Sequence, residues 1–589
     1  MSEVSSYLAY LPPVLWRDDP APGAVSIPGG TPPEPPGDGS EGSESRLGLG
    51  AALRIFEKVA TGLPDDVALV HADPTDPGLV HEHPALTAGI ADLHRLFDPW
   101  TTPASFLPWL ASWVALEFPT LQGLPLWEEY QRRKVIGEIA QIYRLRGRRA
   151  GLNQYLELYA VGQARPRVSV DDGARLLSVI PRPGDLCEVT ALVTQGPVVI
   201  DDAVRSEGLT RPWCVATGAD GGLFVGDVGL PEGAPVRLPS RVWHLDPAGR
   251  YEVAGTPPRP APLAPNTANL RDVVGVAVRP ARDAAPETAY VLTRTGQLFA
   301  IPAPFRGVPA TLVTTLSAAG TAVWMVALTV DPATGDLLVL DRGGRPPQAA
   351  VPRVMTVRPN PLTVTRTRLT TVIEPLSLAV DTDGTLLLGD GGDQEPTGEE
   401  GFAGNLRRVD RRTNPWTETR LLPLLRSDPA DPRIANPLVA PTGVARTRDG
   451  ALYVLDVGLK PFAPSAGSPF ICPVAEHAAV YAVDLTASPP VVVRTTGPGQ
   501  FVYPTGMVAA GDQLVVSDPG QPEVSGLEPY WGRVRPFEFD VSIHFTDSRL
   551  PAEQGARKRV LDQAVGNISS IVSEQKPAHT LWTLNTSIL

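Results

Sequence analysis

The sequence has few cysteines and no long apolar run. Its 589 residues include three cysteines, Cys187, Cys214 and Cys472, which are odd in number and lie far apart. This pattern supplies neither a disulfide framework nor the ligand spacing of a zinc site, so we predict no metal centre from it. No apolar stretch reaches the ~18 residues that a membrane-spanning helix needs, so the sequence predicts no direct insertion into a membrane.

Other absences narrow the class of protein. The first residues, MSEVSSYLAYLPPVLW, do not place a basic region before an apolar one, so we expect no signal peptide and a cytoplasmic location. The formal net charge of −13 argues against nucleic-acid binding through bulk electrostatics. Walker A, GxSxG and dinucleotide motifs are absent as well. The sequence therefore predicts no catalytic residue and no cofactor.

Proline and glycine, in contrast, are abundant. The chain has 65 prolines and 55 glycines. Together they are 120 of 589 residues, about 20%, whereas proline and glycine usually make up about 12% of a chain. This excess excludes a mostly helical protein, because both residues favour turns and loops. Residues 20–45 are rich in Pro, Gly and Ser and almost lack bulky apolar side chains, so we predict a flexible linker there.

Two different periods divide the sequence. Between residues 46 and 161 apolar residues recur every three or four positions, which predicts five helices. One of them should begin at Thr102-Pro103, with Thr as the N-cap, and should carry Trp109 and Trp113. After residue 165 the period changes to two, which is typical of strands.

Six copies of one phrase occupy the strand-rich region. Each copy is a strand, a turn that resembles Asp-Gly, a second strand and usually Asp-x-Gly. The copies begin at Pro212, Val273, Met325, Pro375, Pro441 and Pro504. With four short strands per copy, this repeat predicts a six-bladed β-propeller over residues 185–530, and the phrase resembles NHL-type propellers. We expect segment 186–200 to complete the last blade and close the ring.

The two ends of the chain resemble one known family. The phrases YLAYLPPVLW, LFDPWTTPASFLPWLASWVAL and RRKVIGEIAQIYRLRGRRAGLNQYLELY lie near the N-terminus, and FEFDVSIHF and KPAHT lie near the C-terminus. In this order they resemble the tail protein I family, the baseplate wedge proteins of contractile phage tails and related injection systems. The resemblance implies one α+β wedge domain made of residues 1–165 and 531–589, with the propeller inserted between them. Typical members lack a propeller this large, so its role does not follow from the family.

The family resemblance implies a structural, non-enzymatic function. The chain would help to assemble the baseplate and would couple it to sheath contraction, as one of several copies in a ring. Its partners would be other wedge proteins, such as a baseplate J-like protein, together with the sheath, the tube and the central spike. The particle would assemble in the bacterial cytoplasm and leave the cell on lysis.

A cluster of cations and two tryptophans form the candidate assembly interface. The cations stand out because the protein as a whole is acidic, and they suit an acidic partner, although a solvated helix face explains them equally well. The candidate residues are Arg132, Arg133, Lys134, Arg144, Arg146, Arg148, Arg149, Trp109 and Trp113. Tryptophans in such helices usually lie in the core, but a permanent assembly should bury some of them between chains.

Three acidic or histidine patterns have simpler explanations than metal binding. The aspartates that recur once per blade, such as Asp227 and Asp456, should cap backbone N–H groups. We predict a solvated loop at His81-Glu82-His83 and an exposed acidic loop at 390–400. Two alternatives remain open from the sequence: a metal-dependent propeller hydrolase or lactonase, and a propeller that binds glycans or proteins.

Overall fold

The computed structural model describes most of the chain, with gaps. The described residues are Tyr7, Tyr10, 49–62, 69–72, 80–83, 85–116, 118, 120–121, 124–125, 127–159, 166–173, 176–181, 189–193, 196–200, 203–229, 238–254, 259–263, 270–282, 285–317, 322–344, 351–392, 404–423, 436–459, 476–497, 499–520 and 538–588. The predicted linker at 20–45, Cys187, Cys472 and the acidic run from 393 to 400 lie outside them.

The chain divides into two compact units. The first consists of residues 1–118 and 132–137, and the second contains the remaining residues. The single wedge domain that the sequence predicted from residues 1–165 and 531–589 stays a prediction. The helices of the first unit leave much of their apolar surface exposed.

The first unit contains short helices and one β-hairpin. Its elements are α1 (Leu49–Thr61), β1 (Leu69–Ala72), β2 (Val80–His83), α2 (Leu86–Ala91), the 3-10 helices η3 (Asp92–Phe97) and η4 (Ala104–Phe106), and α3 (Leu107–Trp113). The helix predicted to begin at Thr102-Pro103 therefore starts as a 3-10 turn and becomes α-helical at Leu107. Pro108 lies in the first turn of α3, where its missing N–H breaks no helical hydrogen bond.

The predicted loop at His81-Glu82-His83 is wrong. These residues form strand β2, which pairs antiparallel with β1, so that His81 lies opposite His71. The sequence does not reveal this strand, because β2 is four residues long and has few apolar residues. In addition, β1 ends eight residues before β2 begins, so the two strands are not joined by a recognisable two-residue turn.

The second unit begins with two helices that share a core. Helix α4 (Glu129–Arg144), which contributes residues to both units, follows the short strands β3 (Thr120–Leu121) and β4 (Leu124–Pro125) and leads to α5 (Arg149–Tyr159). Ile139 and Ile142 of α4 are fully buried, and Trp127 packs edge-on against Tyr155 of α5. No helix in the described part of the chain is both long and apolar enough to cross a membrane.

A three-stranded sheet joins distant parts of the sequence. Its order is β34 (Leu581–Ile588), β33 (Glu538–Phe545) and β5 (Arg167–Asp171), with β33 antiparallel to β5 and parallel to β34. Helix α6 (Gln554–Gln575) connects the parallel pair and contacts α5. The C-terminal strand, helix and strand therefore lie against α5 and β5.

Six further sheets form the β-propeller. The first blade has three strands, β10 (Pro212–Thr217), β11 (Leu223–Asp227) and β12 (Arg241–Leu245). The second blade consists of β15 (Val273–Arg279), β16 (Thr288–Thr293), β17 (Gln297–Pro302) and β18 (Thr311–Thr315), and the third of β19 (Met325–Val330), β20 (Leu337–Asp341), β21 (Arg353–Pro359) and β22 (Leu362–Arg368). The fourth blade consists of β23 (Pro375–Val380), β24 (Leu386–Asp390), β25 (Asn405–Asp410) and β26 (Thr417–Arg420), and the fifth of β27 (Pro441–Arg446), β28 (Leu452–Asp456), β29 (Ala479–Asp484) and β30 (Val491–Arg494). Two short hairpins, β8 (Val198–Ile200) with β9 (Ala203–Ser206) and β13 (Val253–Ala254) with β14 (Arg259–Pro260), stand beside them.

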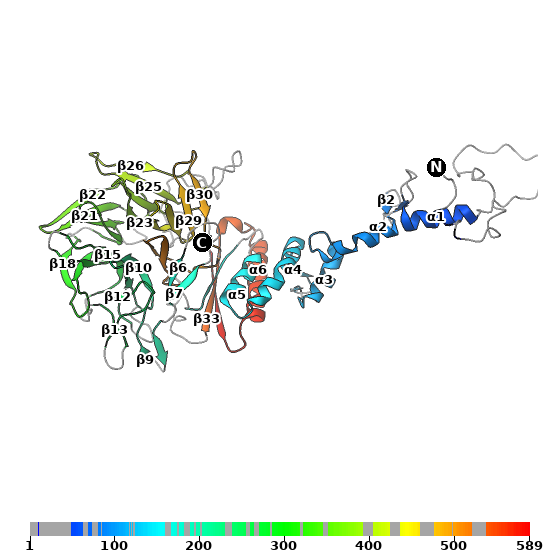
Figure 1. Cartoon of the computed structure of the whole chain (residues 1–589), viewed down its shortest axis with the longest axis horizontal. Helices are drawn as coiled ribbons and strands as arrows, with labels where there is room; N and C mark the ends of the chain where they lie inside the picture. Colours follow the sequence, from blue (N-terminus) through cyan, green and yellow to red (C-terminus); the bar gives the residue numbers. More distant parts are fainter. Residues whose placement is uncertain are drawn as a thin grey trace, which may run out of the picture. The chain divides into compact units, whose positions relative to one another are not determined.

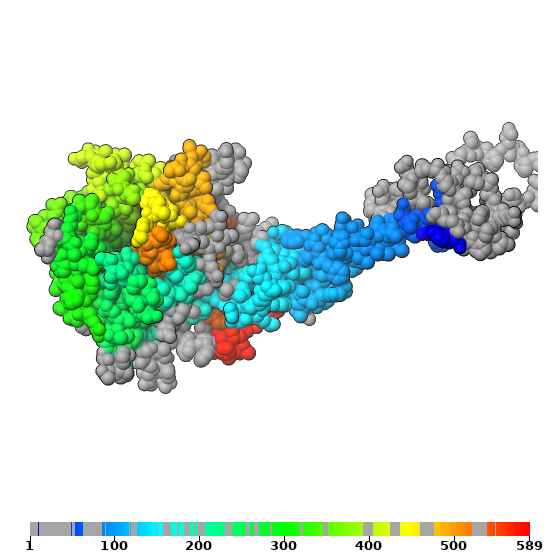
Figure 2. Space-filling view, viewed as in Figure 1, coloured from blue at the N-terminus to red at the C-terminus, as the bar shows by residue number. Residues whose placement is uncertain are grey.

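The sixth blade closes the ring with strands from both sides of the repeat region. Its order is β31 (Gly506–Ala510), β32 (Gln513–Ser517), β6 (Leu177–Ile180) and β7 (Thr190–Val193). The inner strand β31 contacts both β27 and β10. In Figure 2 the orange strands β31 and β32 lie next to the yellow part of the fifth blade. The ring in Figure 1 therefore has no free edge between its last and first blades.

The closing segment begins earlier than the sequence predicted. Strand β6, which pairs directly with β32, starts at Leu177, before the predicted boundary at 185. Within the predicted segment 186–200, β7 is the outermost strand of this blade, whereas β8 belongs to a separate hairpin. The alternation of β6 is hard to recognise because only four residues pair, and three of them are buried.

Candidate assembly surface and propeller channel

The first unit exposes a cluster of four aromatic rings. Trp109 and Trp113 lie one turn apart on α3, and their ring centroids are 5.0 Å apart. Phe97 of η3 packs against both, at 5.9 and 5.6 Å, and Phe106 packs edge-on against Trp109 at 5.6 Å. We call Phe97, Phe106, Trp109 and Trp113 the aromatic cluster. Its rings order one another, yet Trp113 is 64% and Trp109 40% exposed.

Helix α3 therefore has two apolar faces. Leu107, Leu110 and Ala111 are buried, and they supply the core side of the helix. The two candidate interface tryptophans occupy the opposite side, where they are exposed. A single exposed aromatic residue is ordinary, but a contiguous exposed set of this size is typical of a protein interface.

Helices α1 and α2 extend the exposed apolar surface of the first unit. In α1 Ile55, Phe56 and Val59 are exposed. In α2 Leu86 and Ile90 are exposed as well. An amphipathic helix keeps its apolar stripe out of water, so these helices need a covering surface.

The first three candidate cations serve the local fold to different degrees. Arg133 donates from one Nη to the carbonyl oxygens of Pro99 and Thr102, at 2.6 and 2.8 Å. Arg132 lies over the ring of Phe118, at 5.6 Å from its centroid. Lys134 is half-buried and has no ion-pair partner among the described residues.

The other four cations lie in the second unit, and two of them are structural. Arg146 donates to the carbonyl oxygen of Glu574 at 2.8 Å, which links the end of α4 to α6. Arg149 pairs with Asp172 at 3.5 Å, close to the end of β5. Arg144 and Arg148 are exposed, and no described residue pairs with their side chains. Arg146 and Arg149 thus hold the local fold, and the predicted docking role of the seven cations stays a prediction.

The repeated aspartates confirm the capping prediction. The carboxylate of Asp227 accepts N–H groups from Thr210 and Arg211 at 2.8 Å and from Gly229 at 2.9 Å. Its equivalents Asp341, Asp390, Asp456 and Asp518 accept backbone N–H groups at the same place in their blades. Each carboxylate ties the start of an inner strand to the end of the next strand, and the described residues contain no group of three or more metal-ligating side chains.

The second blade departs from this pattern. Thr293 occupies the position of the aspartate, as its pairing with Val273 shows. The next residue, Arg294, donates from Nε to Asp272 at 2.9 Å. The phrase Thr-Arg-Thr-Gly in place of Asp-x-Gly was the available sequence signal, but a degenerate repeat is usually dismissed as drift.

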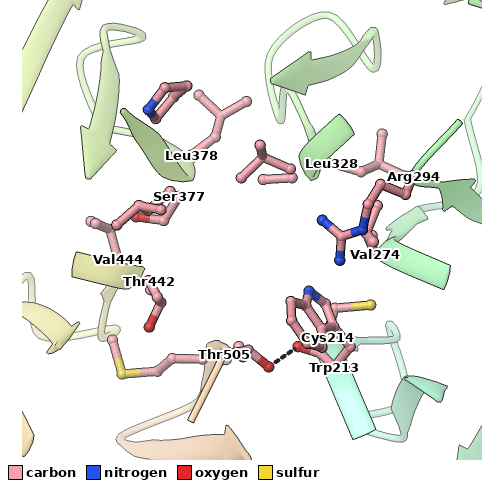
Figure 3. A pocket seen from close by; sticks show the side chains of 18 of the residues that line it. Trp213, Cys214, Val274, Arg294, Leu328, Ser377, Leu378, Thr442, Val444 and Thr505 are labelled. Atoms are coloured by element: carbon pink, nitrogen blue, oxygen red, sulfur yellow. Dashed lines mark hydrogen bonds between the residues drawn. The ribbon is translucent and has the colours of Figure 1, made fainter. Parts of the chain in front are cut away.

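The inner strands surround a channel that contains a cavity of about 130 Å³. Figure 3 shows Val274, Leu328, Leu378 and Val444 around it, with the guanidinium of Arg294 pointing into the open centre. Ser377, Thr442 and Thr505 also line the cavity, and the hydroxyl of each gives its hydrogen to a backbone carbonyl: Ser377 to Pro441, Thr442 to Pro504 and Thr505 to Trp213.

The channel offers little for catalysis among its described lining. Burial raises the pKa of the Cys214 thiol to about 12, so this group stays protonated and weakly nucleophilic at neutral pH. The carboxylate of Glu374 is held by the guanidinium of Arg342, whose Nε lies 2.8 and 2.9 Å from its two oxygens. Neither side chain is placed as a free nucleophile or base.

A buried arginine fixes the three-stranded sheet to the propeller. Arg167 of β5 is 1% exposed and donates to the carbonyl oxygens of Val457 and Val502, which belong to the fifth and sixth blades. The distance to the Val502 oxygen is 2.6 Å. Arg549 adds an ion pair with Glu476 at 2.9 Å. Sequence analysis missed Arg167 because an arginine next to a strand usually lies in solvent.

This junction should make stability sensitive to acid. Burial and the nearby charge of Arg167 lower the pKa of His544 in β33 from 6.5 to about 3. The folded protein keeps this imidazole neutral, whereas the unfolded chain takes up a proton below pH 6.5. The stability that the neutral His544 contributes is thus fully present above pH 6.5 and is lost as the pH falls toward 3, by about 1.4 kcal/mol per pH unit.

Urea unfolding from pH 7 to 5 should show this loss in the wild type, and His544→Gln should reduce the loss by about 1 to 2 kcal/mol. Equal slopes in both proteins would contradict the assignment.

The comparisons with known proteins agree with a phage tail component. Residues 77–166 match the model of a phage tail protein family, Tail_P2_I. The matched segment contains the aromatic cluster and all seven candidate cations, and it supports a structural role in a phage tail. No curated protein matches the chain.

The solved structures similar to this chain share little sequence with it. A protein of unknown function from Bacteroides thetaiotaomicron is 12% identical over 60% of this chain and 76% of its own, with a TM-score of 0.33. A proposed gluconolactonase is 11% identical over 55% of this chain and 92% of its own, with a TM-score of 0.31. The Swd1 β-propeller domain of Myceliophteria thermophila is 9% identical over 52% of this chain and 97% of its own, with a TM-score of 0.28. At such values these likenesses carry no argument about activity, and the six sheets themselves define the propeller.

Proposed function

We propose that the protein is a baseplate wedge subunit of a contractile phage tail or of a related injection system. The observation that carries the proposal is the exposed aromatic cluster, which lies within the segment that matches the phage tail protein family. A free cytoplasmic protein that kept Trp113, Trp109 and Phe97 exposed would tend to aggregate. A subunit that is permanently covered by its neighbours would not.

The two units would then have different mechanical roles. The helices of the first unit would bind neighbouring wedge proteins, such as a baseplate J-like protein, and several copies would form a ring around the central spike. The second unit would supply a rigid body, because β5, β33 and β34 tie both sides of the propeller into one sheet. Through such a ring the sheath would receive the signal to contract.

The unpaired cations would contribute specificity at this interface. Lys134, Arg144 and Arg148 are the candidate cations whose side chains meet no described partner. An acidic partner surface would steer association with them, which raises the association rate more than the affinity. Arg133, Arg146 and Arg149 would act indirectly, through the local fold that they hold together.

Co-purification with a partner tests the proposal. The chain should be expressed with and without the baseplate J-like protein and the sheath protein from the same gene neighbourhood, and each sample should be sized by chromatography and light scattering. We expect the chain alone to form soluble oligomers of no fixed size, and the mixture to give a defined complex of several subunits. A stable, soluble monomer that ignores every tail protein would contradict the proposal.

A deletion tests whether the propeller is an accessory module. Asp171 at the end of β5 pairs directly with Asp540 in β33, so a short turn can replace residues 174–537. Because Arg167 would lose its carbonyl partners, it should be changed to Thr in the same variant. We expect a soluble remainder that still joins the complex. A folded remainder that no longer assembles would show that the propeller is itself a joint of the baseplate.

A further inference from the structure

The charge of Arg294 is unusually well fixed inside the propeller channel. Its guanidinium carbon lies 5.0 Å from the ring centroid of Trp213 and 4.8 Å from that of Trp324, so the two indoles enclose the cation between them. The residue is 8% exposed. An arginine held in this way has lost its rotamer freedom before any ligand arrives, which lowers the entropic cost of binding.

Some N–H groups of this guanidinium are available to a ligand. Its Nε donates to Asp272 at 2.9 Å and one Nη donates to the carbonyl oxygen of Met325 at 3.4 Å. Of the five N–H groups of an arginine, three therefore meet no acceptor among the described residues. Figure 3 shows the group directed into the cavity. A buried donor that faces open space is costly unless a ligand or water accepts from it.

The remaining wall defines the ligand further. Cys214 is a neutral thiol at physiological pH, and Arg342 and Glu374 neutralise each other within the lining. Arg294 is also ion-paired, but its partner Asp272 is half-exposed and does not line the cavity, so Arg294 is the cation that the cavity itself presents. The hydroxyls of Ser377, Thr442 and Thr505 give their hydrogens to backbone carbonyls, so they offer acceptors and not donors to a ligand. Most of the remaining lining is apolar and consists of aliphatic and aromatic side chains. The cavity, at about 130 Å³, is on the order of ten times what one water requires.

From these features we infer that the propeller channel binds a small monocarboxylate with a short aliphatic tail. The carboxylate accepts two parallel hydrogen bonds from Arg294, in the forked geometry that arginine favours. The tail contacts Val274, Leu328 and Val444. This site goes beyond the proposed assembly function, because it lies on the inner strands of the propeller and uses none of the candidate interface residues.

Fluorine NMR with trifluoroacetate as the probe tests this site in the full chain. We expect saturable broadening of the trifluoroacetate signal, which propionate reverses and the neutral isostere propionamide does not. Arg294→Gln should weaken binding at least tenfold. Arg412→Gln, which changes a 70% exposed arginine on the same propeller, should leave it unchanged.

A second variant guards against misfolding of the first. Leu328→Phe fills the cavity and keeps Arg294, so it should also weaken trifluoroacetate binding at least tenfold, with an unchanged circular dichroism spectrum. Absence of saturable binding in the wild type overturns the inference. So does binding that survives in both Arg294→Gln and Leu328→Phe, or competition by propionamide as strong as that by propionate.

Discussion

Replacing Trp109 and Trp113 together by Asp should abolish assembly with the partner proteins while the chain itself stays folded. In the isolated chain both side chains are substantially exposed, so two carboxylates there remain hydrated. The substitution removes four ring contacts within the aromatic cluster, each worth roughly 0.5 to 1.5 kcal/mol, and leaves the buried residues on the other side of α3 in place. In an assembled interface the same carboxylates lose their water without gaining a partner, at a cost of several kcal/mol each. We expect the affinity for a partner to fall by roughly 1,000-fold or more, since every 1.4 kcal/mol is a factor of ten.

A matched control separates an interface effect from a general effect of surface charge. Leu362 of β22 is 46% exposed on the propeller, which is comparable to Trp109 at 40%. Leu362→Asp should leave assembly unchanged in the same co-expression and sizing experiment. If the double variant assembles as well as the wild type, the aromatic cluster does not form the interface. If Leu362→Asp alone also blocks assembly, the propeller rim takes part in it.

The second large effect is expected at the junction between the sheet and the propeller. Arg167→Met should lower the free energy of unfolding of the second unit by about 3 kcal/mol or more. It removes two charge-assisted hydrogen bonds and leaves the buried carbonyl oxygens of Val457 and Val502 without their donor. Arg167→Lys should recover only part of the loss, because one ammonium cannot reach both oxygens as a planar fork does.

Urea unfolding followed by circular dichroism measures the loss at this junction. Arg412→Met provides the control, because this arginine is highly exposed and its ion pair with Asp410 lies at the surface. Its effect should stay within about 0.5 kcal/mol. A similar small effect for Arg167→Met would show that the two carbonyl oxygens find water or another donor.

The repeat made the propeller predictable from the sequence. The way in which the ring closes could be predicted only in part. Each copy carries its own strands, turn and capping aspartate, so local patterns were sufficient for five blades. The sixth blade joins β32 to β6, and the partner of a strand that far away leaves no local trace. The four-residue strand β6 was therefore placed too late in the chain, although the need for a closed ring correctly required such a strand.

The candidate site was predictable in composition but not in geometry. The sequence singled out Trp109, Trp113 and the seven cations, yet the period of α3 does not tell which of its two apolar faces is covered. Arg133 and Arg146 bond to carbonyl oxygens that are distant in sequence, which no pattern of charges reveals. Arg167 and Arg294 were missed for the same reason, since their role depends on the groups that tertiary structure brings around them.

Electron cryomicroscopy of tail-like particles tests the central claim most directly. The tail-like particles of the host should be purified, and their baseplates reconstructed with the symmetry of the ring. We predict several symmetry-related copies of the three-stranded sheet with its six-bladed propeller at the baseplate, and the aromatic cluster buried against a neighbouring subunit. Particles that lack this chain, together with a free chain that hydrolyses lactones or esters, would contradict the account.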